Sequence, residues 1–141
     1  MSTGPTHLTH IPAPEGVFPA TAYTHVVVGT GRFIAISGQL ALDENGALVG
    51  ADDPGAQARQ VFANLGRCLA AAGTDFDSVV KLTYFVTDMA HMPAIREARD
   101  THLDPTRLPA SSAVQVTALV NPSYLLEIEA YAIVPTEEAP A

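Results

Sequence analysis

The sequence predicts an α+β fold in which two helices cover one face of a mixed β-sheet. Three observations support this fold class. The chain has 141 residues, a length that suits one domain. Apolar residues make up 48% of it and charged residues only 16%, so the chain can bury a sizeable core. Segments with strand-like and helix-like patterns follow one another in the order ββ(β)αβαββ.

The first part of the chain is expected to be strand-rich. Residues 1–20 contain several prolines, which interrupt hydrogen-bonded ladders, so we predict a loose or peripheral N-terminal segment there. Residues 23–28 and 33–39 are β-branched and apolar, and the glycines between them predict a hairpin. A second turn leads to a short returning strand at 47–49. The single domain is expected to span residues 21–135.

The first helix has clear signals at both ends. Asp53 supplies an N-cap, and Pro54 suits the first helical position. Gly73 stands where a left-handed residue ends a helix. The apolar residues between them recur at helical spacing: Val61, Phe62, Leu65, Cys68, Leu69 and Ala72.

The second half of the chain continues the alternation. Residues 79–86 read as a strand, and Asp88 can cap a helix over about 90–103. Two strands follow at 113–119 and 124–134, and residues 136–141 form a C-terminal tail. The second helix is expected to turn four apolar side chains inward: Met92, Ile95, Ala98 and Leu103.

The last strand separates two kinds of side chain. Leu126, Ile128 and Ala130 suit the face that the helices cover, whereas Leu125, Glu127, Glu129 and Tyr131 point to the other face. The two carboxylates stand ~6.6 Å apart by strand rise. They form either a solvated or ion-paired face or an acid and base pair whose burial differs. Either water or another subunit must cover this face.

Composition excludes several partners and chemistries. Seven Lys and Arg against 15 Asp and Glu give a formal charge of −8, which argues against nucleic acid and anionic membrane surfaces. No apolar run approaches the ~20 residues that span a bilayer. The single cysteine, Cys68, allows no intramolecular disulfide, so we expect a cytoplasmic protein. The five histidines match no metal-binding motif, so we expect no metal site. Ser111-Ser112 lacks a nucleophile elbow, which argues against a serine hydrolase.

Several short motifs, in this order and at these separations, resemble the RidA/YjgF family over about residues 23–134. They are Ser37-Gly38-Gln39, Asn64, Ala72-Gly73, Val86-x-Asp88, Leu108-Pro109-Ala110 and Glu127-Ile128-Glu129-Ala130. The resemblance implies a chorismate-mutase-like fold with ferredoxin-like layering. It also implies a homotrimer with a central β-barrel and a ligand cleft at each subunit interface. Well-studied members hydrolyse reactive enamines and imines to a 2-oxo acid and ammonia without a cofactor.

The resemblance also implies site residues. Glu127 matches the glutamate that positions or activates water, and Tyr23 matches a tyrosine that lines the cleft. Ser37 and Gly38 belong to the cleft motif. The family's substrate-binding arginine is replaced by Ser111, and a hydroxyl does not supply the charged, bidentate contact that a guanidinium makes with a carboxylate.

Two functions follow from this pattern. The first is an imine or enamine hydrolase whose substrate lacks the usual carboxylate handle, with Glu127 activating water and Ser111 donating a hydrogen bond. The alternative is a non-catalytic, small-molecule-binding or regulatory trimer of the same fold. Arg107 lies four residues before Ser111 and would replace the arginine only if its loop folds back. Ribonuclease activity, which the family's name carries, conflicts with the net charge of −8.

Overall fold

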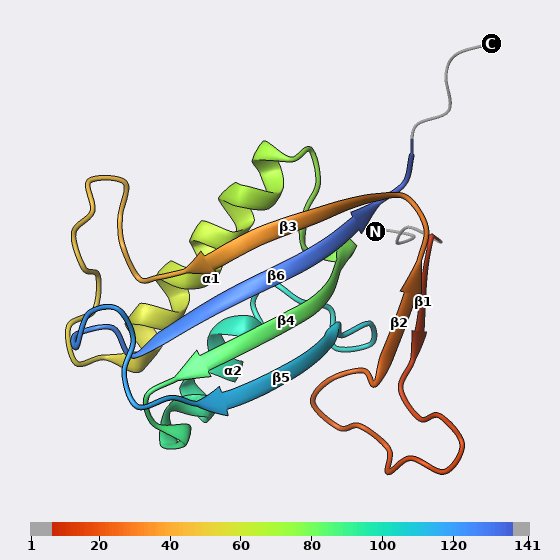
Figure 1. Ribbon diagram of the computed structural model, residues 1–141, viewed down its shortest axis with the longest axis horizontal. Helices are drawn as coiled ribbons and strands as arrows, with labels where there is room; N and C mark the ends of the chain where they lie inside the picture. Colours follow the sequence, from red (N-terminus) through yellow and green to blue (C-terminus); the bar gives the residue numbers. More distant parts are fainter. Residues whose placement is uncertain (1–6, 137–141) are drawn as a thin grey trace.

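A computed structural model describes residues 7–136 of the chain (Figure 1). The strands are β1 (Leu8–Ile11), β2 (Val26–Gly29), β3 (Arg32–Gln39), β4 (Val79–Val86), β5 (Ala110–Gln115) and β6 (Leu126–Val134). The α-helices are α1 (Pro54–Ala71) and α2 (Met92–Arg99), and two single-turn 3₁₀ helices lie at Phe76–Ser78 and Met89–His91. None of the helices in this described range is long and apolar enough to cross a bilayer.

The main sheet has the strand order β3-β6-β4-β5. Strand β6 is antiparallel to both of its neighbours, and β5 is parallel to β4, so the sheet is mixed. Both α-helices lie behind the same face of this sheet in Figure 1. The α+β class and the two-helix layer are therefore confirmed.

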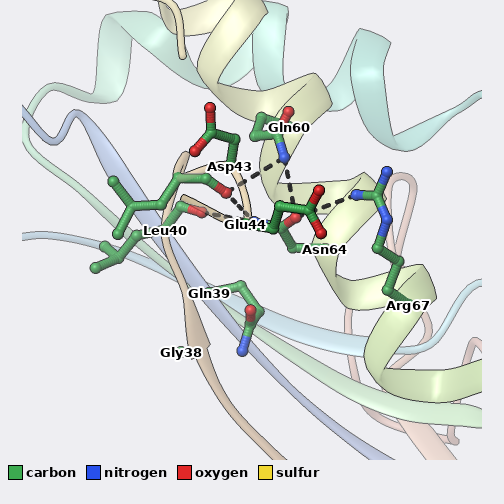
Figure 2. A pocket seen from close by; sticks show the side chains of 9 residues that line it. Gly38, Gln39, Leu40, Asp43, Glu44, Gln60, Asn64 and Arg67 are labelled. Atoms are coloured by element: carbon green, nitrogen blue, oxygen red, sulfur yellow. Dashed lines mark hydrogen bonds between the residues drawn. The ribbon is translucent and has the colours of Figure 1, made fainter. Parts of the chain in front are cut away.

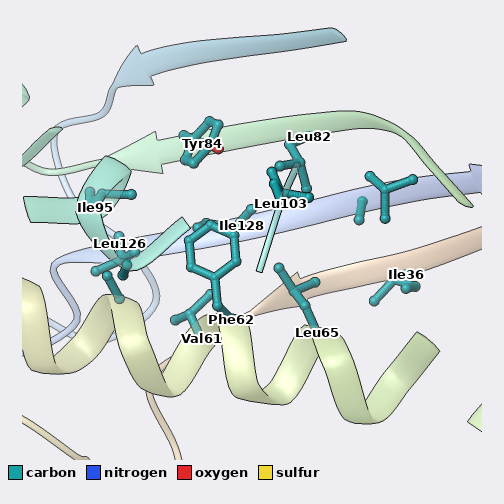
Figure 3. Packing of buried hydrophobic residues seen from close by; sticks show 14 of the residues in the cluster. Ile36, Val61, Phe62, Leu65, Leu82, Tyr84, Ile95, Leu103, Leu126 and Ile128 are labelled. Carbon is teal, nitrogen blue, oxygen red and sulfur yellow. The ribbon is translucent and has the colours of Figure 1, made fainter. Parts of the chain in front are cut away.

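Helix α1 begins and ends as the sequence predicts. The Asp53 carboxylate accepts a hydrogen bond from the Ala56 backbone N–H at 3.0 Å, and Pro54 occupies the first turn. Gly73 has a φ of +82°, the left-handed conformation expected just after a helix. The buried stripe of α1 packs on the sheet, where Phe62 and Leu65 face Leu82 and Ile128 (Figure 3).

Replacing Asp53 by alanine tests the N-cap. The substitution leaves the Ala56 N–H without its partner, and we expect the free energy of unfolding to fall by ~1 kcal/mol. Urea unfolding at fixed protein concentration measures the change. Glu97→Ala removes an exposed carboxylate from α2 that makes no side-chain hydrogen bond with residues 7–136, and it should change stability by less than ~0.5 kcal/mol. Equal effects of the two changes would contradict the capping role.

Helix α2 is shorter than predicted, but its inward face is right. The chain folds as a 3₁₀ turn over Met89–His91 before α2 starts at Met92, and the Asp88 carboxylate caps this turn through the Ala90 N–H. Pro93 sits in the first turn of α2, where its missing N–H leaves no helical hydrogen bond unmade. All four predicted inward residues are buried: Met92, Ile95, Ala98 and Leu103.

The predicted hairpin between residues 23–28 and 33–39 is wrong. Strand β2 pairs with β1 in a separate two-stranded sheet, whereas β3 pairs with β6. Gly31 explains the break: its φ is +140°, and a Cβ there would collide with the Val134 carbonyl. The glycine lets the chain turn closely over the end of β6, so the two strands diverge instead of pairing.

Three other expectations need correction. Residues 1–20 are not wholly irregular, because Leu8–Ile11 form β1. The prolines of this segment lie outside β1, so the strand keeps the N–H donors that it needs to pair with β2. The short strand at 47–49 is reduced to an isolated bridge between Leu42 and Leu48. Strand β5 begins at Ala110, three residues before its predicted start, because it pairs in parallel with β4 from Lys81 onward. Nearly all of the predicted tail 136–141 lies outside the described residues.

The two-faced character of β6 is confirmed, except that Leu125, predicted on the face opposite the helices, precedes β6 and packs against the core. Leu126, Ile128 and Ala130 are buried under the helices, whereas Glu127 and Glu129 on the opposite face are half-buried. This opposite face, which the helices leave open, also carries the large side chains of Phe33 and Tyr131, with ring centroids 5.4 Å apart. Phe33 is 64% exposed in the single chain. We call this surface the open face of the sheet.

Candidate functional site

The Glu127 carboxylate lies directly over Gly38. The pairing of β3 with β6 is irregular between Ile36 and Gln39, and Gly38 stands in this irregularity. A Cβ on Gly38 would lie 2.7 Å from Cγ and 2.6 Å from Cδ of Glu127, far inside van der Waals contact. The glycine therefore makes the space that the Glu127 side chain occupies.

Replacing Gly38 by alanine tests this close approach. The added methyl group forces the Glu127 carboxylate to a new position, and we expect any activity that depends on this carboxylate to slow by about 10-fold or more. Initial rates measure the loss. Gly55→Ala adds the same atom on α1, where its nearest neighbours are 3.3 Å or more away, and should leave the rate unchanged. An unaltered rate in Gly38→Ala would separate the glycine from the function of Glu127.

A polar pocket opens beside Gly38, between the end of β3 and helix α1 (Figure 2). Its volume is about 580 Å³. The Asn64 amide donates hydrogen bonds to the carbonyls of Leu40 and Leu42 at 3.0 and 2.9 Å, and so ties α1 to the loop after β3. Gln60 and Arg67 each donate to the Asn64 side-chain oxygen. The pocket wall next to Gly38 is thus fixed by side-chain bonds.

Tyr23 and Ser111 line a second, smaller pocket. It has a volume of about 130 Å³ and lies between the loop before β2, helix α2 and strand β5. The Thr24 backbone N–H donates to the Pro109 carbonyl at 3.1 Å, which holds Tyr23 beside the start of β5. Tyr23 and Ser111 therefore line the same pocket within one chain.

A single chain separates these two groups of residues. In the parallel ladder Ser111 pairs with Leu82, whose side chain is buried under the helices, so Ser111 faces the helix side. Glu127 pairs with Phe85, three residues further along β4, and faces the open side. The structure brings Glu127 together with Gly38 and brings Ser111 together with Tyr23, but it does not bring the two pairs together. Ser37, which is exposed, adjoins Gly38 on β3.

Comparison with known proteins identifies the family. A family model described as endoribonuclease L-PSP matches residues 14–134. The chain belongs to the RidA/YjgF family. A 2-iminobutanoate/2-iminopropanoate deaminase from Mus musculus is 43% identical over 106 residues, which cover 72% of this chain and 74% of the mouse protein. A RutC family protein from Synechocystis is 35% identical over 126 residues, covering 89% of this chain and 92% of the relative.

Solved structures of family members agree with the fold. A Rid family protein of unknown function from Yersinia pestis superimposes with a TM-score of 0.80 at 34% identity, covering 92% of this chain and all of the other. RidA from an Antarctic Psychrobacter gives a TM-score of 0.67 at 32% identity, covering 95% of this chain and all of that protein. The RidA/YjgF architecture therefore extends over nearly the whole chain.

Arg107 does not take the place of an arginine at position 111. Its guanidinium lies 3.4 Å from the Asp104 carboxylate and 3.5 Å from that of Asp77, and it is not among the residues that line the pocket with Ser111. Hydrogen bonds from Thr106 and Arg107 lower the pKa of Asp104, so this carboxylate stays charged and retains Arg107. The loop does not fold back.

Sequence reasoning missed two polar groups that the structure buries or places in a pocket. Gln57 lies four residues before Val61, which places a polar side chain within the apolar stripe of α1. The Gln57 side chain is fully buried. Arg96 and Arg99 line the pocket that holds Ser111. Their spacing from Met92 places all three on one side of α2, and this is the signal that was available.

The described histidines do not gather into a metal-binding cluster, and one of them, His25, contacts Tyr23 of the second pocket edge-on, with ring centroids 5.1 Å apart. Among residues 7–136, no three His, Cys, Asp or Glu side chains gather in a way that suits a metal ion. The His7 ring donates a hydrogen bond to the Ile133 carbonyl at 2.6 Å. In the N-terminal His7-x-x-His10 pair, His7 therefore connects the start of β1 to β6.

Proposed function

We propose that the chain is a RidA-like hydrolase of a small reactive imine or enamine, with Glu127 as its catalytic residue. The observation that carries the proposal is the Glu127 carboxylate, held over Gly38 on the open face of the sheet. The names of relatives at 35–43% identity support the reaction class, because they are deaminases of 2-iminobutanoate, 2-iminopropanoate and 3-aminoacrylate. A carboxylate and a water molecule suffice for this chemistry.

The reaction needs one proton carrier. Water adds to the C=N carbon while the Glu127 carboxylate takes a water proton and delivers it to the nitrogen. The resulting carbinolamine then gives its hydroxyl proton to the nitrogen through the same carboxylate, and it collapses to a C=O group as the C–N bond breaks and ammonia leaves. An enamine first takes a proton on carbon and becomes the imine. The sum is imine plus water giving carbonyl compound plus ammonia, so no redox partner is required.

The cleft of the proposed enzyme lies between copies of the chain. Glu127 and Gly38 face the open side of the sheet, whereas Tyr23 and Ser111 face the helix side, so one chain carries the two halves of the predicted site apart. A homotrimer with the open faces lining a central barrel would cover the exposed Phe33 and set one half of each site against the other half from a neighbour. The proposed cleft is therefore intersubunit.

The proposed enzyme lacks the arginine that holds the carboxylate of a typical 2-imino acid in the family pattern. Strand β5 offers the hydroxyl of Ser111 where the family places a guanidinium, and Arg107 is bound to two aspartates elsewhere. The same replacement favours the second candidate function, a trimer that binds a small molecule without transforming it. RNA cleavage is not proposed, because a chain with a net charge of −8 repels phosphate backbones.

A substrate panel tests the proposal. Imines and enamines, both carboxylate-bearing and neutral, are generated in place by an auxiliary enzyme, and ammonia and carbonyl product are measured with and without the purified chain. We expect at least one class to be hydrolysed at least about 10-fold faster than in buffer. If every substrate decays at the buffer rate while one of them raises the melting temperature and is recovered unchanged, the protein is a binder instead of an enzyme.

A further inference from the structure

The pocket that holds Tyr23 and Ser111 carries an excess of positive charge. Arg96 and Arg99 both line it, and they are two of only seven cationic side chains in a chain of net charge −8. Asp100 is the acidic side chain paired with them among the described residues, through Arg99 at 2.8 Å. Two guanidinium groups against one carboxylate leave this small volume positive.

The two arginines differ in the contacts that they make within the chain. Arg99 is engaged: its side chain is 12% exposed, it donates to the Ala22 carbonyl at 2.9 Å, and it donates to Asp100 through two further nitrogens. Arg96 is exposed and makes no hydrogen bond or ion pair with another residue in the range 7–136. Arg99 therefore builds the pocket wall, and Arg96 has its N–H donors free for a ligand.

A buried hydroxyl in the same pocket also lacks a partner. Tyr84 is only 3% exposed, and no group in the described part of the chain accepts a hydrogen bond from its hydroxyl. Burial raises the pKa of Tyr84 to about 12, against the opposing effect of the nearby Arg99 and Arg96, so the phenol stays protonated and remains a donor. An unpaired buried hydroxyl costs about 1–3 kcal/mol. A ligand that brought an acceptor oxygen into the pocket would remove this cost.

We infer that this pocket is an anion subsite in which Arg96 on α2 binds the carboxylate of a small ligand, with the hydroxyls of Tyr84 and Ser111 as further donors. The pocket supplies cations and O–H donors, and a carboxylate supplies the acceptor oxygens that these groups lack. Resting on the proposed function, the inference makes the substrate an imino or enamine acid. Its acid group is anchored from helix α2 and not from strand β5.

The size of the pocket fits one end of such a ligand. A volume of about 130 Å³ holds about four water molecules, which is room for a carboxylate and a short carbon chain. It is well below the ~300–1,000 Å³ of complete ligand sites. The reacting C=N group would therefore extend out of the pocket toward the neighbouring copy, which is where the proposed cleft places Glu127.

The test compares propanoate with propanamide, its neutral isostere, as probes of the assembled full-length protein. Neither probe is a substrate, so the measurement does not depend on catalysis. We expect propanoate, titrated by NMR, to bind about 10-fold more tightly than propanamide and to shift signals of α2 and β5. Arg96→Gln should weaken propanoate binding by about 10-fold, whereas Arg59→Gln, which removes an exposed cation from α1, should leave it unchanged.

Tyr84→Phe provides a second variant that separates ligand binding from folding. It keeps the ring in the core and removes only the unpaired hydroxyl, so stability should stay equal or rise while propanoate binds several-fold more weakly. Equal affinity for the two probes, or propanoate binding that survives Arg96→Gln, would overturn the subsite. If the subsite binds propanoate but no imine is hydrolysed, the proposed function fails and the inference stands. If imines are hydrolysed equally well with and without Arg96, the inference fails and the function stands.

Discussion

Replacing Glu127 by glutamine is expected to lower the rate of imine hydrolysis by about 100-fold or more. Positioned acid and base groups contribute about 10² to 10⁴ to a rate, and glutamine cannot take the proton that the attacking water loses. The change keeps the size and shape of the side chain, so the contact with Gly38 survives and the fold should be unaltered. Steady-state kinetics on the best substrate of the panel gives the loss in kcat.

Glu129→Gln is the matched control for this experiment. Glu129 stands two residues further along β6, points to the same open face and is also half-buried, but it lies beside Thr83 in the sheet, and the atoms nearest to a Cβ at position 38 all belong to Glu127. We expect its replacement to change kcat by less than about 3-fold. Comparable losses in both variants would mean that the charge of the open face as a whole matters, and Glu127 would lose its special role.

Mixing two damaged copies tests whether the cleft is shared. Glu127→Gln and Tyr23→Ala remove one residue from each half of the proposed site, so each homotrimer should be nearly inactive. In trimers formed by co-expression at equal levels, about a quarter of the heterologous interfaces combine an intact Glu127 with an intact Tyr23. Recovery of about that fraction of wild-type activity supports an intersubunit cleft, and no recovery places both residues in the same copy's site.

The elements with strong local signals are those that the sequence predicts correctly. Helix α1 combines an N-cap at Asp53, a proline in its first turn, an apolar stripe and a glycine after its end, and the structure has each of them. Strand β6 shows the two-residue period of a sheet with one covered face, so the placement of Glu127 opposite to the core also follows from the sequence. Local chemistry decides both elements.

The local sequence pattern does not predict which distant segments pair with each other. Residues 23–28 and 33–39 have all the local features of a hairpin, yet the partner of each strand is set by long-range contacts: β1 for one and β6 for the other. The anion pocket is hidden for the same reason. Arg96 is an ordinary exposed residue of a short helix until β5 and the Tyr23 loop come to lie beside it.

Gln57→Leu should lower the free energy of unfolding by ~3 kcal/mol. The Gln57 side chain is fully buried and donates to the carbonyls of Gly50 and Ser123, both at 3.1 Å, while its own oxygen accepts from the Leu125 N–H at 2.9 Å. Leucine fills the space but leaves three backbone groups without partners, and each group that stays unpaired costs about 1–3 kcal/mol. Urea unfolding at matched protein concentration measures the change.

The same bonds connect stability with the site. Gln57 holds the turn at 121–125, and strand β6 follows at once with Glu127 in its second position, so loosening this turn should also shift the carboxylate. We therefore expect Gln57→Leu to lower kcat by several-fold even at temperatures where the protein is fully folded. Arg59→Leu, an exposed change on the same helix, should alter neither quantity. A Gln57→Leu protein with wild-type kcat would show that the turn and the Glu127 carboxylate are mechanically independent.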